Sequence, residues 1–170
     1  MNFRVLVLIL SSFFFSIFLN ADELKRDNKN TEFNIYSGMF DFSDDGKRST
    51  LIGFQHQNED LNRDTFLGNL SPITGAMITA DNATYFYTGV QANYEIGSLK
   101  FTPSFTPGYY EKGDGKDLGS VLEFKSEIKF GLEIFENSKL SYSYSHISNN
   151  EWGETNPGTD NQQITFSKNF

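Results

Sequence analysis

From residue 33 onward, apolar and polar residues alternate with a period of two, and clusters of Gly, Asn and Asp interrupt the alternation. This pattern is typical of β-strands, because successive side chains in a strand point to opposite faces of the sheet. No window shows the three-to-four-residue period of an amphipathic helix. We therefore predict about eight strands, at residues 33–42, 49–57, 65–80, 84–96, 99–110, 118–135, 140–149 and 160–170.

The stretch 118–135 has two clearly different faces. One face carries Leu122, Phe124, Ile128 and Phe130, and the other carries Glu123, Lys125, Glu127 and Lys129. Charges of alternating sign can pair inside a narrow barrel, and an eight-stranded barrel has room for side chains but not for a channel. We therefore expect the apolar face to meet lipid and the charged face to fill the interior, which argues against a pore.

The connections and the aromatic content favour a membrane barrel. Aromatic residues make up 16% of the chain, and short turns at 97–98 and 136–138 alternate with longer polar loops. Outer-membrane barrels combine lipid-facing alternation, aromatic girdles, short periplasmic turns and long external loops. The predicted fold is an all-β, eight-stranded antiparallel transmembrane β-barrel. A soluble lipid-binding barrel fits less well, because the chain ends on the aromatic Phe170 after an outward apolar alternation.

The N-terminus has the pattern of a secretory signal peptide. Arg4 precedes an uncharged, mainly apolar run from Val5 to Leu19, and the small residue Ala21 follows just before charged residues. The run is shorter than the roughly 20 residues of a spanning helix. We predict a signal peptide at 1–21, a polar lead-in at 22–32 and the barrel at 33–170, which would place the protein in the bacterial outer membrane.

Composition excludes several classes of function. The formal net charge is −8 and no basic stripe is present, which argues against nucleic-acid binding. There is no cysteine, so no disulfide contributes to stability. His56 has no second histidine or cysteine nearby and shares the parity of Ile52 and Phe54, so we expect an interfacial side chain. No metal site and no cofactor are predicted.

The candidate chemistry lies in the last two predicted strands. His146 and Ser148 share the parity of Tyr142 and Tyr144, which is the outward, lipid-facing parity. Asp160 begins the next strand with outward parity as well. Same-face neighbours in a strand are about 7 Å apart at the backbone, a gap that an imidazole can close. The spacing suits a triad with Ser148 as nucleophile, His146 as general base and then acid, and Asp160 as the orienting carboxylate.

Two further features belong to the same loop. Asn156, or a backbone amide near Asn149 and Asn150, is the candidate donor to an oxyanion. Trp152, the only tryptophan, is expected to anchor the loop at the headgroup level or to contact substrate. The alternative interpretation is a catalytically silent barrel with a structural or surface-interaction role, in which His146 is an interfacial ring and Asp160 merely begins a strand.

These motifs resemble a known family. The segment His146-Ile147-Ser148-Asn149, followed by Asn156-Pro157-Gly158, is similar to the signature of the PagL-type lipid A 3-O-deacylases, outer-membrane barrels of the acyloxyacyl hydrolase family. The run from Phe101 to Tyr110 and the segment from Asp117 to Phe124 also resemble that family. The resemblance covers roughly residues 65–170.

The resemblance implies an outward-facing Ser-His-acid triad on an eight-stranded barrel. It implies a serine esterase that removes the acyl chain ester-linked at position 3 of lipid A, so the expected partners are lipopolysaccharide and outer-membrane lipid. This chain departs from the family's best-known members at one point, because they carry glutamate where Asp160 stands. A carboxylate that is one methylene shorter keeps the chemistry but requires the two strands to lie closer together.

Overall fold

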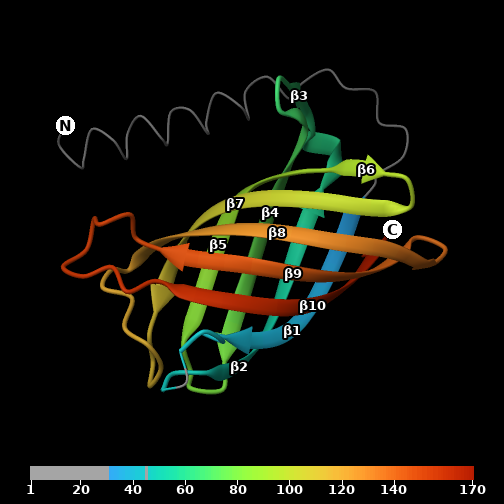
Figure 1. Ribbon diagram of the computed structural model, residues 1–170. Coiled ribbons are helices and arrows are strands. Elements are labelled where there is room, and N and C mark those ends of the chain that lie inside the picture. Colours follow the sequence, from blue (N-terminus) through green and yellow to red (C-terminus); the bar gives the residue numbers. More distant parts are fainter. Residues whose placement is uncertain (1–30, 45) are drawn as a thin grey trace.

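The computed structural model describes residues 31–44 and 46–170 and forms a closed antiparallel barrel (Figure 1). Eight long strands make up the wall. They are β1 (Thr31–Phe40), β2 (Ser49–Asn58), β4 (Gly68–Thr79), β5 (Thr84–Ala92), β7 (Leu99–Glu111), β8 (Leu122–Phe135), β9 (Ser138–Ser148) and β10 (Thr159–Asn169). Each pairs with its neighbour in order, β10 pairs with β1, and β2 pairs with β4 across the short insertion between them. This confirms the predicted eight-stranded barrel.

The N-terminal boundary differs slightly from the prediction. Strand β1 begins at Thr31, so Thr31 and Glu32 lie in the wall rather than in the predicted lead-in. The reason is that Glu32 is buried inside the barrel, where its carboxylate pairs with Lys139. The predicted signal peptide at 1–21, and the rest of the lead-in to residue 30, lie outside the described residues.

Two short strands extend the wall. The predicted strand 65–80 is divided, because residues 66–67 form a turn between β3 (Arg63–Thr65) and β4. The predicted strand 84–96 breaks at Asn93 and continues as β6 (Tyr94–Ile96), which pairs with β7. A 3-10 turn, η1 (Glu59–Leu61), links β2 to β3. The long connection after β2 is therefore a small hairpin built onto the barrel edge.

The interior is filled with side chains, most of them polar, as predicted for the charged face of residues 118–135, together with a buried apolar cluster that includes Phe40, Leu51 and Tyr85. Lys125 and Glu127 are buried, and Lys125 Nζ lies 3.0 Å from Glu127 Oε2. Lys125 Nζ also lies 4.1 Å from the centre of the Tyr87 ring, a cation–π contact. Buried charges are tolerated in proteins when they are paired and hydrogen-bonded. These contacts fix the register in which β8 presents its other face outward.

The outer surface of the wall is apolar. Exposed large side chains from neighbouring strands include Ile35, Phe54, Phe86, Phe105, Ile128, Phe130, Tyr142 and Phe166. The register brings these residues side by side, with Phe101 opposite Phe130 and Phe130 opposite Tyr142. A continuous apolar band around a closed barrel is the surface that lipid covers. Among the described residues, no helix is long and apolar enough to cross a membrane.

The strand directions place one end of β9 at the site. Strand β9 ends at Ser148 and β10 begins at Thr159, so residues 149–158 connect them at the same end of the barrel as the β7–β8 connection (Figure 1). The C-terminus lies at the opposite end. The candidate site therefore lies at the loop end of the wall.

Candidate active site

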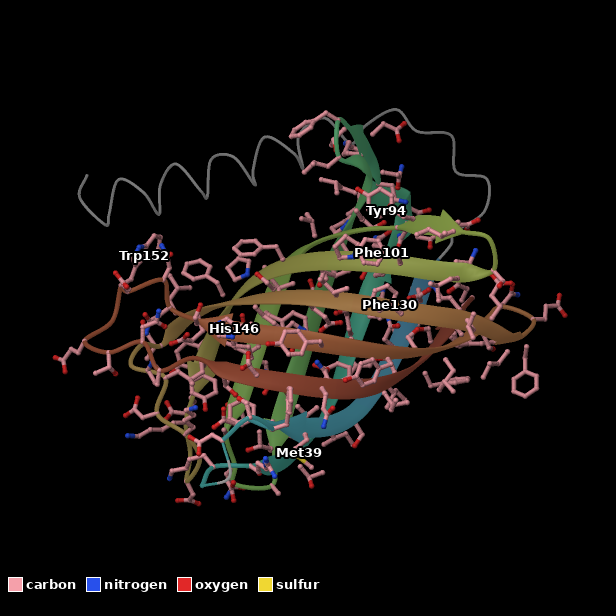
Figure 2. All side chains as sticks on the ribbon, in the orientation of Figure 1. Met39, Tyr94, Phe101, Phe130, His146 and Trp152 are labelled. Carbon is pink, nitrogen blue, oxygen red and sulfur yellow. The ribbon has the colours of Figure 1, made fainter. Side chains whose placement is uncertain are left out.

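The hydrogen-bonded register of the last two strands brings two of the predicted residues together. His146 on β9 lies directly opposite Asp160 on β10. His146 Nδ1 is 2.8 Å from Asp160 Oδ1. Both side chains are on the outer face, and Figure 2 shows His146 near the end of the barrel whose loop carries Trp152. The carboxylate thus holds one ring nitrogen and leaves Nε2 for proton transfer.

Ser148 lies two residues beyond His146 on the same strand. Tyr142, Tyr144 and His146 are exposed and the intervening serines are buried, so Ser148 has the outward parity predicted from the sequence. Its side chain is partly exposed. In the described chain Ser148 Oγ is not hydrogen-bonded to the histidine ring. Hydrogen bonds of this kind often form only when substrate is bound.

Asp160 accepts two hydrogen bonds besides that of the histidine. Tyr144 Oη donates to Asp160 Oδ1 over 2.7 Å, and Ser43 Oγ donates to Oδ2 over 3.2 Å. Ser43 comes from the connection between β1 and β2, far away in sequence. The Tyr144 ring packs edge-on against Phe42, with centroids 6.0 Å apart. Both carboxylate oxygens are therefore held by donors from different segments of the chain.

Gly158 lies against the histidine ring. Its φ is +61°, a backbone conformation that residues other than glycine adopt only with strain. A Cβ at this position would lie 2.9 Å from His146 Cε1 and 3.2 Å from Nε2. Glycine is therefore required here for two reasons, the backbone conformation and the space that the ring occupies.

Asn149 holds the loop that follows Ser148. Its side chain is fully buried, and Nδ2 donates to the carbonyl oxygens of Leu118 (2.7 Å) and Thr155 (2.8 Å). Asn150 and Glu151 both have positive φ, as in a type I′ turn, and Trp152 N–H donates to the Asn149 carbonyl. One amide thus ties the β7–β8 and β9–β10 connections together.

A charged pair stabilises the β7–β8 connection beside this contact. Lys112 Nζ lies 2.7 Å from Asp117 Oδ2, and Gly119 N–H donates to Asp117 Oδ1. The hydrogen bond from Lys112, reinforced by that of Gly119, lowers the pKa of the Asp117 carboxyl. The carboxylate therefore shapes the turn that presents the Leu118 carbonyl to Asn149.

The two candidate oxyanion donors are placed differently. The backbone N–H of Asn149 donates to Asn156 Oδ1 over 3.1 Å, and both protons of the Asn149 amide are engaged as described above. Asn156 is exposed on the same loop, three residues before Thr159 begins β10. The Asn149 backbone N–H is thus already donated to the Asn156 side chain.

Aromatic rings flank Ser148 on the β8 side. Phe124 lies opposite Ser148 in the register. Trp152 packs edge-on against Phe124 with centroids 5.2 Å apart, and Phe105 stacks on Phe124 at 6.0 Å. Trp152 remains half exposed. This row of rings lies between the outer apolar band and Ser148.

Three residues of the site were not predicted from the sequence. For Tyr144 the sequence predicts the outward face but not the hydrogen bond to Asp160, although its position two residues before His146 is a signal for that bond. For Gly158, the signal in the sequence is the proline–glycine pair before β10, which is typical of a turn with positive φ. Nothing in the spacing pointed to Ser43, which reaches Asp160 through the closure of the barrel. Among the described residues, no group of three metal-binding side chains is found.

Comparison with known proteins gives consistent matches. The family model of lipid A 3-O-deacylases (PagL) matches residues 36–169. The lipid A deacylase PagL of Bordetella bronchiseptica (strain RB50) is 34% identical over 55 residues, which are 32% of this chain and 31% of the relative. The matching segment thus spans about a third of that relative's length.

Solved barrels share the fold. The crystal structure of the outer membrane enzyme PagL superposes with a TM-score of 0.61 at 15% identity, over 81% of this chain and 98% of that one. A de novo designed transmembrane β-barrel gives 0.58 at 9% identity, over 86% and 100%. The outer membrane protein Ail of Yersinia pestis gives 0.51 at 12% identity, over 84% and 100%.

Proposed function

Because the chain belongs to the lipid A 3-O-deacylase (PagL) family, we propose that it is an outer-membrane serine esterase that releases the acyl chain ester-linked at position 3 of lipid A. The observation that carries the proposal is the 2.8 Å contact between His146 Nδ1 and Asp160 Oδ1, with Ser148 on the same outward face of the barrel. Ser148 is the nucleophile, His146 the proton carrier and Asp160 the orienting group.

The first half of the reaction transfers the acyl chain to the enzyme. His146 Nε2 takes the proton of Ser148 Oγ as the oxygen attacks the ester carbonyl carbon, and a tetrahedral intermediate forms. When the bond between that carbon and the sugar oxygen breaks, His146 returns the proton to the sugar oxygen. The lipid leaves with a free 3-hydroxyl, and Ser148 carries the acyl group.

The second half repeats these steps with water. His146 takes a proton from water, whose oxygen attacks the acyl-serine carbonyl carbon. The bond to Ser148 Oγ then breaks, His146 protonates that oxygen, and the fatty acid leaves. Asp160 stabilises the imidazolium in both halves without itself taking the proton. The Asn156 side chain is our proposed oxyanion donor, and removing such a donor costs other enzymes about 10²–10³-fold in rate.

The outward direction of the site suits a lipid substrate. The acyl chains of lipid A lie in the membrane, and His146, Ser148 and Asp160 have the outward parity of the face that carries the apolar band. The row of Phe105, Phe124 and Trp152 leads from that band to Ser148. A substrate therefore reaches the serine from the lipid layer without entering the filled barrel.

Mass spectrometry of lipid A tests this proposal. A Gram-negative host expresses the wild-type chain, Ser148→Ala, or the control Ser145→Ala, whose side chain faces the interior. Outer-membrane fractionation confirms equal amounts of each protein. We expect loss of one 3-linked acyl chain with the wild type and Ser145→Ala, and intact lipid A with Ser148→Ala. Intact lipid A with all three would favour the catalytically silent barrel.

A further inference from the structure

The Asp160 carboxylate is held by three donors from two parts of the fold, strand β9 and the connection between β1 and β2. His146 on β9 and Tyr144 on the same strand both contact Oδ1, at 2.8 and 2.7 Å. Ser43, from the connection between β1 and β2, donates to Oδ2 at 3.2 Å. The histidine alone would leave the carboxylate free to rotate about its Cβ–Cγ bond, since it contacts only one oxygen.

We propose that Tyr144 and Ser43 are positioning residues that hold the Asp160 carboxylate in the orientation in which it directs His146. This inference rests on the function proposed above. Neither residue touches the reacting atoms, and each acts through Asp160. The two hydroxyl groups contact different oxygens, so together they fix the plane of the carboxylate.

The surroundings of Asp160 explain why it needs such support. Its side chain is only partly exposed and lies on the outer face of the wall, next to the apolar band. Lipid supplies few hydrogen bonds there, and an ionised carboxylate away from water is stable only when donors surround it. Tyr144 itself is kept in place by the edge-on contact of its ring with Phe42. The donor is therefore already oriented before substrate binds.

The chain offers a close internal comparison. Tyr142, two residues earlier on the same face of β9, donates through its hydroxyl to Gln162 Oε1 over 3.2 Å. Tyr142 and Tyr144 thus make equivalent bonds from β9 to β10, one step apart. Only the bond of Tyr144 ends on the residue that contacts His146. If the two tyrosines only anchored the barrel in lipid, substitution of Tyr142 and of Tyr144 should affect activity equally.

Kinetics of purified protein in detergent micelles with lipid A separate these roles. We expect Tyr144→Phe to lower kcat about tenfold, equivalent to about 1.4 kcal/mol, with KM little changed. Ser43→Ala should act in the same direction, and the double variant should fall further. Tyr142→Phe and Ser37→Ala, which remove exposed hydroxyl groups elsewhere on the wall, should match the wild type. A rise in KM without loss of kcat would instead assign Tyr144 to substrate contact and overturn the inference.

Nuclear magnetic resonance gives a readout that does not depend on turnover. The chain has two histidines, so ¹⁵N-histidine labelling yields signals from His146 and His56 alone. His56 packs against Phe33 and serves as an internal reference. We expect Tyr144→Phe to shift the Nδ1–H proton of His146, because Asp160 then has one donor fewer, and to leave His56 unchanged. Unchanged signals from both histidines would contradict the proposed positioning role.

The wild type and Ser148→Ala, run in the same kinetic assay, keep the two proposals distinguishable. An inactive Ser148→Ala beside a fully active Tyr144→Phe would overturn only the positioning role. Equal activity of the wild type and Ser148→Ala would overturn the proposed function, and the histidine signals would then decide the positioning role alone.

Discussion

Asp160 lies directly opposite His146 in the β9–β10 ladder, and its Oδ1 is 2.8 Å from His146 Nδ1. Cross-strand neighbours on one face of a sheet are close enough for short side chains to meet. The backbone register therefore positions the histidine–carboxylate pair, and the shorter aspartate suffices because the two strands are directly hydrogen-bonded. The same register places Ser148 beyond the pair, at the end of β9.

The roles assigned to this pair predict an order of activity among variants. Asp160→Asn should lose on the order of 10⁴-fold in kcat, because the amide still contacts the ring but no longer stabilises the imidazolium. His146→Ala should lose on the order of 10⁶-fold, because proton transfer itself is lost. Rates of fatty-acid release from lipid A by the purified variants check this order. Equal losses in the two variants would show that the acid is wrongly assigned.

Gly158→Ala should reduce activity through the histidine ring. A Cβ at this position would lie 2.9 Å from His146 Cε1, so the ring has to move. Displacement of a catalytic group by about 1 Å can cost about 10²-fold in rate. We expect a loss of that order in kcat, measured on the purified variant.

Gly97→Ala is the matched control for that substitution. Gly97 has nearly the same φ, +64°, but a Cβ there would meet no atom within 4 Å. Both alanine substitutions introduce the same backbone strain of about 1–2 kcal/mol. Gly97→Ala should therefore be destabilised to a similar extent and remain active. Equal activity of the two variants would mean that Gly158 is needed only for its backbone.

Asn149→Ala should loosen the loop that follows the serine. The substitution removes the donors to the Leu118 and Thr155 carbonyls, and leaving a buried polar group unpaired costs about 1–3 kcal/mol. We expect the free energy of unfolding in urea, measured in lipid vesicles, to fall by that amount, and activity to fall with it. Asn69→Ala removes an exposed hydrogen bond from the Asn69 side-chain amide to Asp64, and it should change neither the free energy of unfolding nor the activity. Full stability of Asn149→Ala would refute its role in the loop.

A charged residue on the outer wall should destabilise the barrel more when it lies deeper in the bilayer. Ile128 lies at the middle of β8 on the outer face, and Ile96 ends β6 at the turn into β7. Arginine costs about 2–4 kcal/mol at the bilayer midplane and about 0–1 near the interface. Ile128→Arg should therefore destabilise the barrel in vesicles by about 2–4 kcal/mol and Ile96→Arg by less than 1. Equal costs would argue that this face does not meet lipid.

The strands and their faces were predictable because a period of two is a local signal. The parity of Tyr142, Tyr144, His146 and Ser148 identified the outward face before any pairing was known. The short strand β3 was missed because Phe66 and Leu67 are apolar and continued the β-like pattern, although they form a turn. Apolar side chains at an exposed hairpin tip follow no periodic rule.

The candidate site was predictable only in part, for a physical reason. His146 and Asp160 lie on paired strands with the same parity, so spacing and parity were enough to predict that these two side chains meet, and they place Ser148 on the same outward face. The contact of Ser43 with Asp160 joins segments that meet only when β1 pairs with β10 and closes the barrel, and the contact of Asn149 with Leu118 joins two loops. Side chains in loops have no face that alternation can assign, so the sequence pattern does not predict such contacts.

Reaction with a serine-directed fluorophosphonate tests the assigned triad most directly. The purified wild type, Asp160→Asn, His146→Ala and Ser148→Ala react with the reagent in micelles, and peptide mass spectrometry locates the adduct. The triad predicts a single adduct on Ser148, formed fastest in the wild type, more slowly in Asp160→Asn and not at all in the other two variants. An adduct on another serine, or equal labelling of Ser148 in the wild type and His146→Ala, would contradict it.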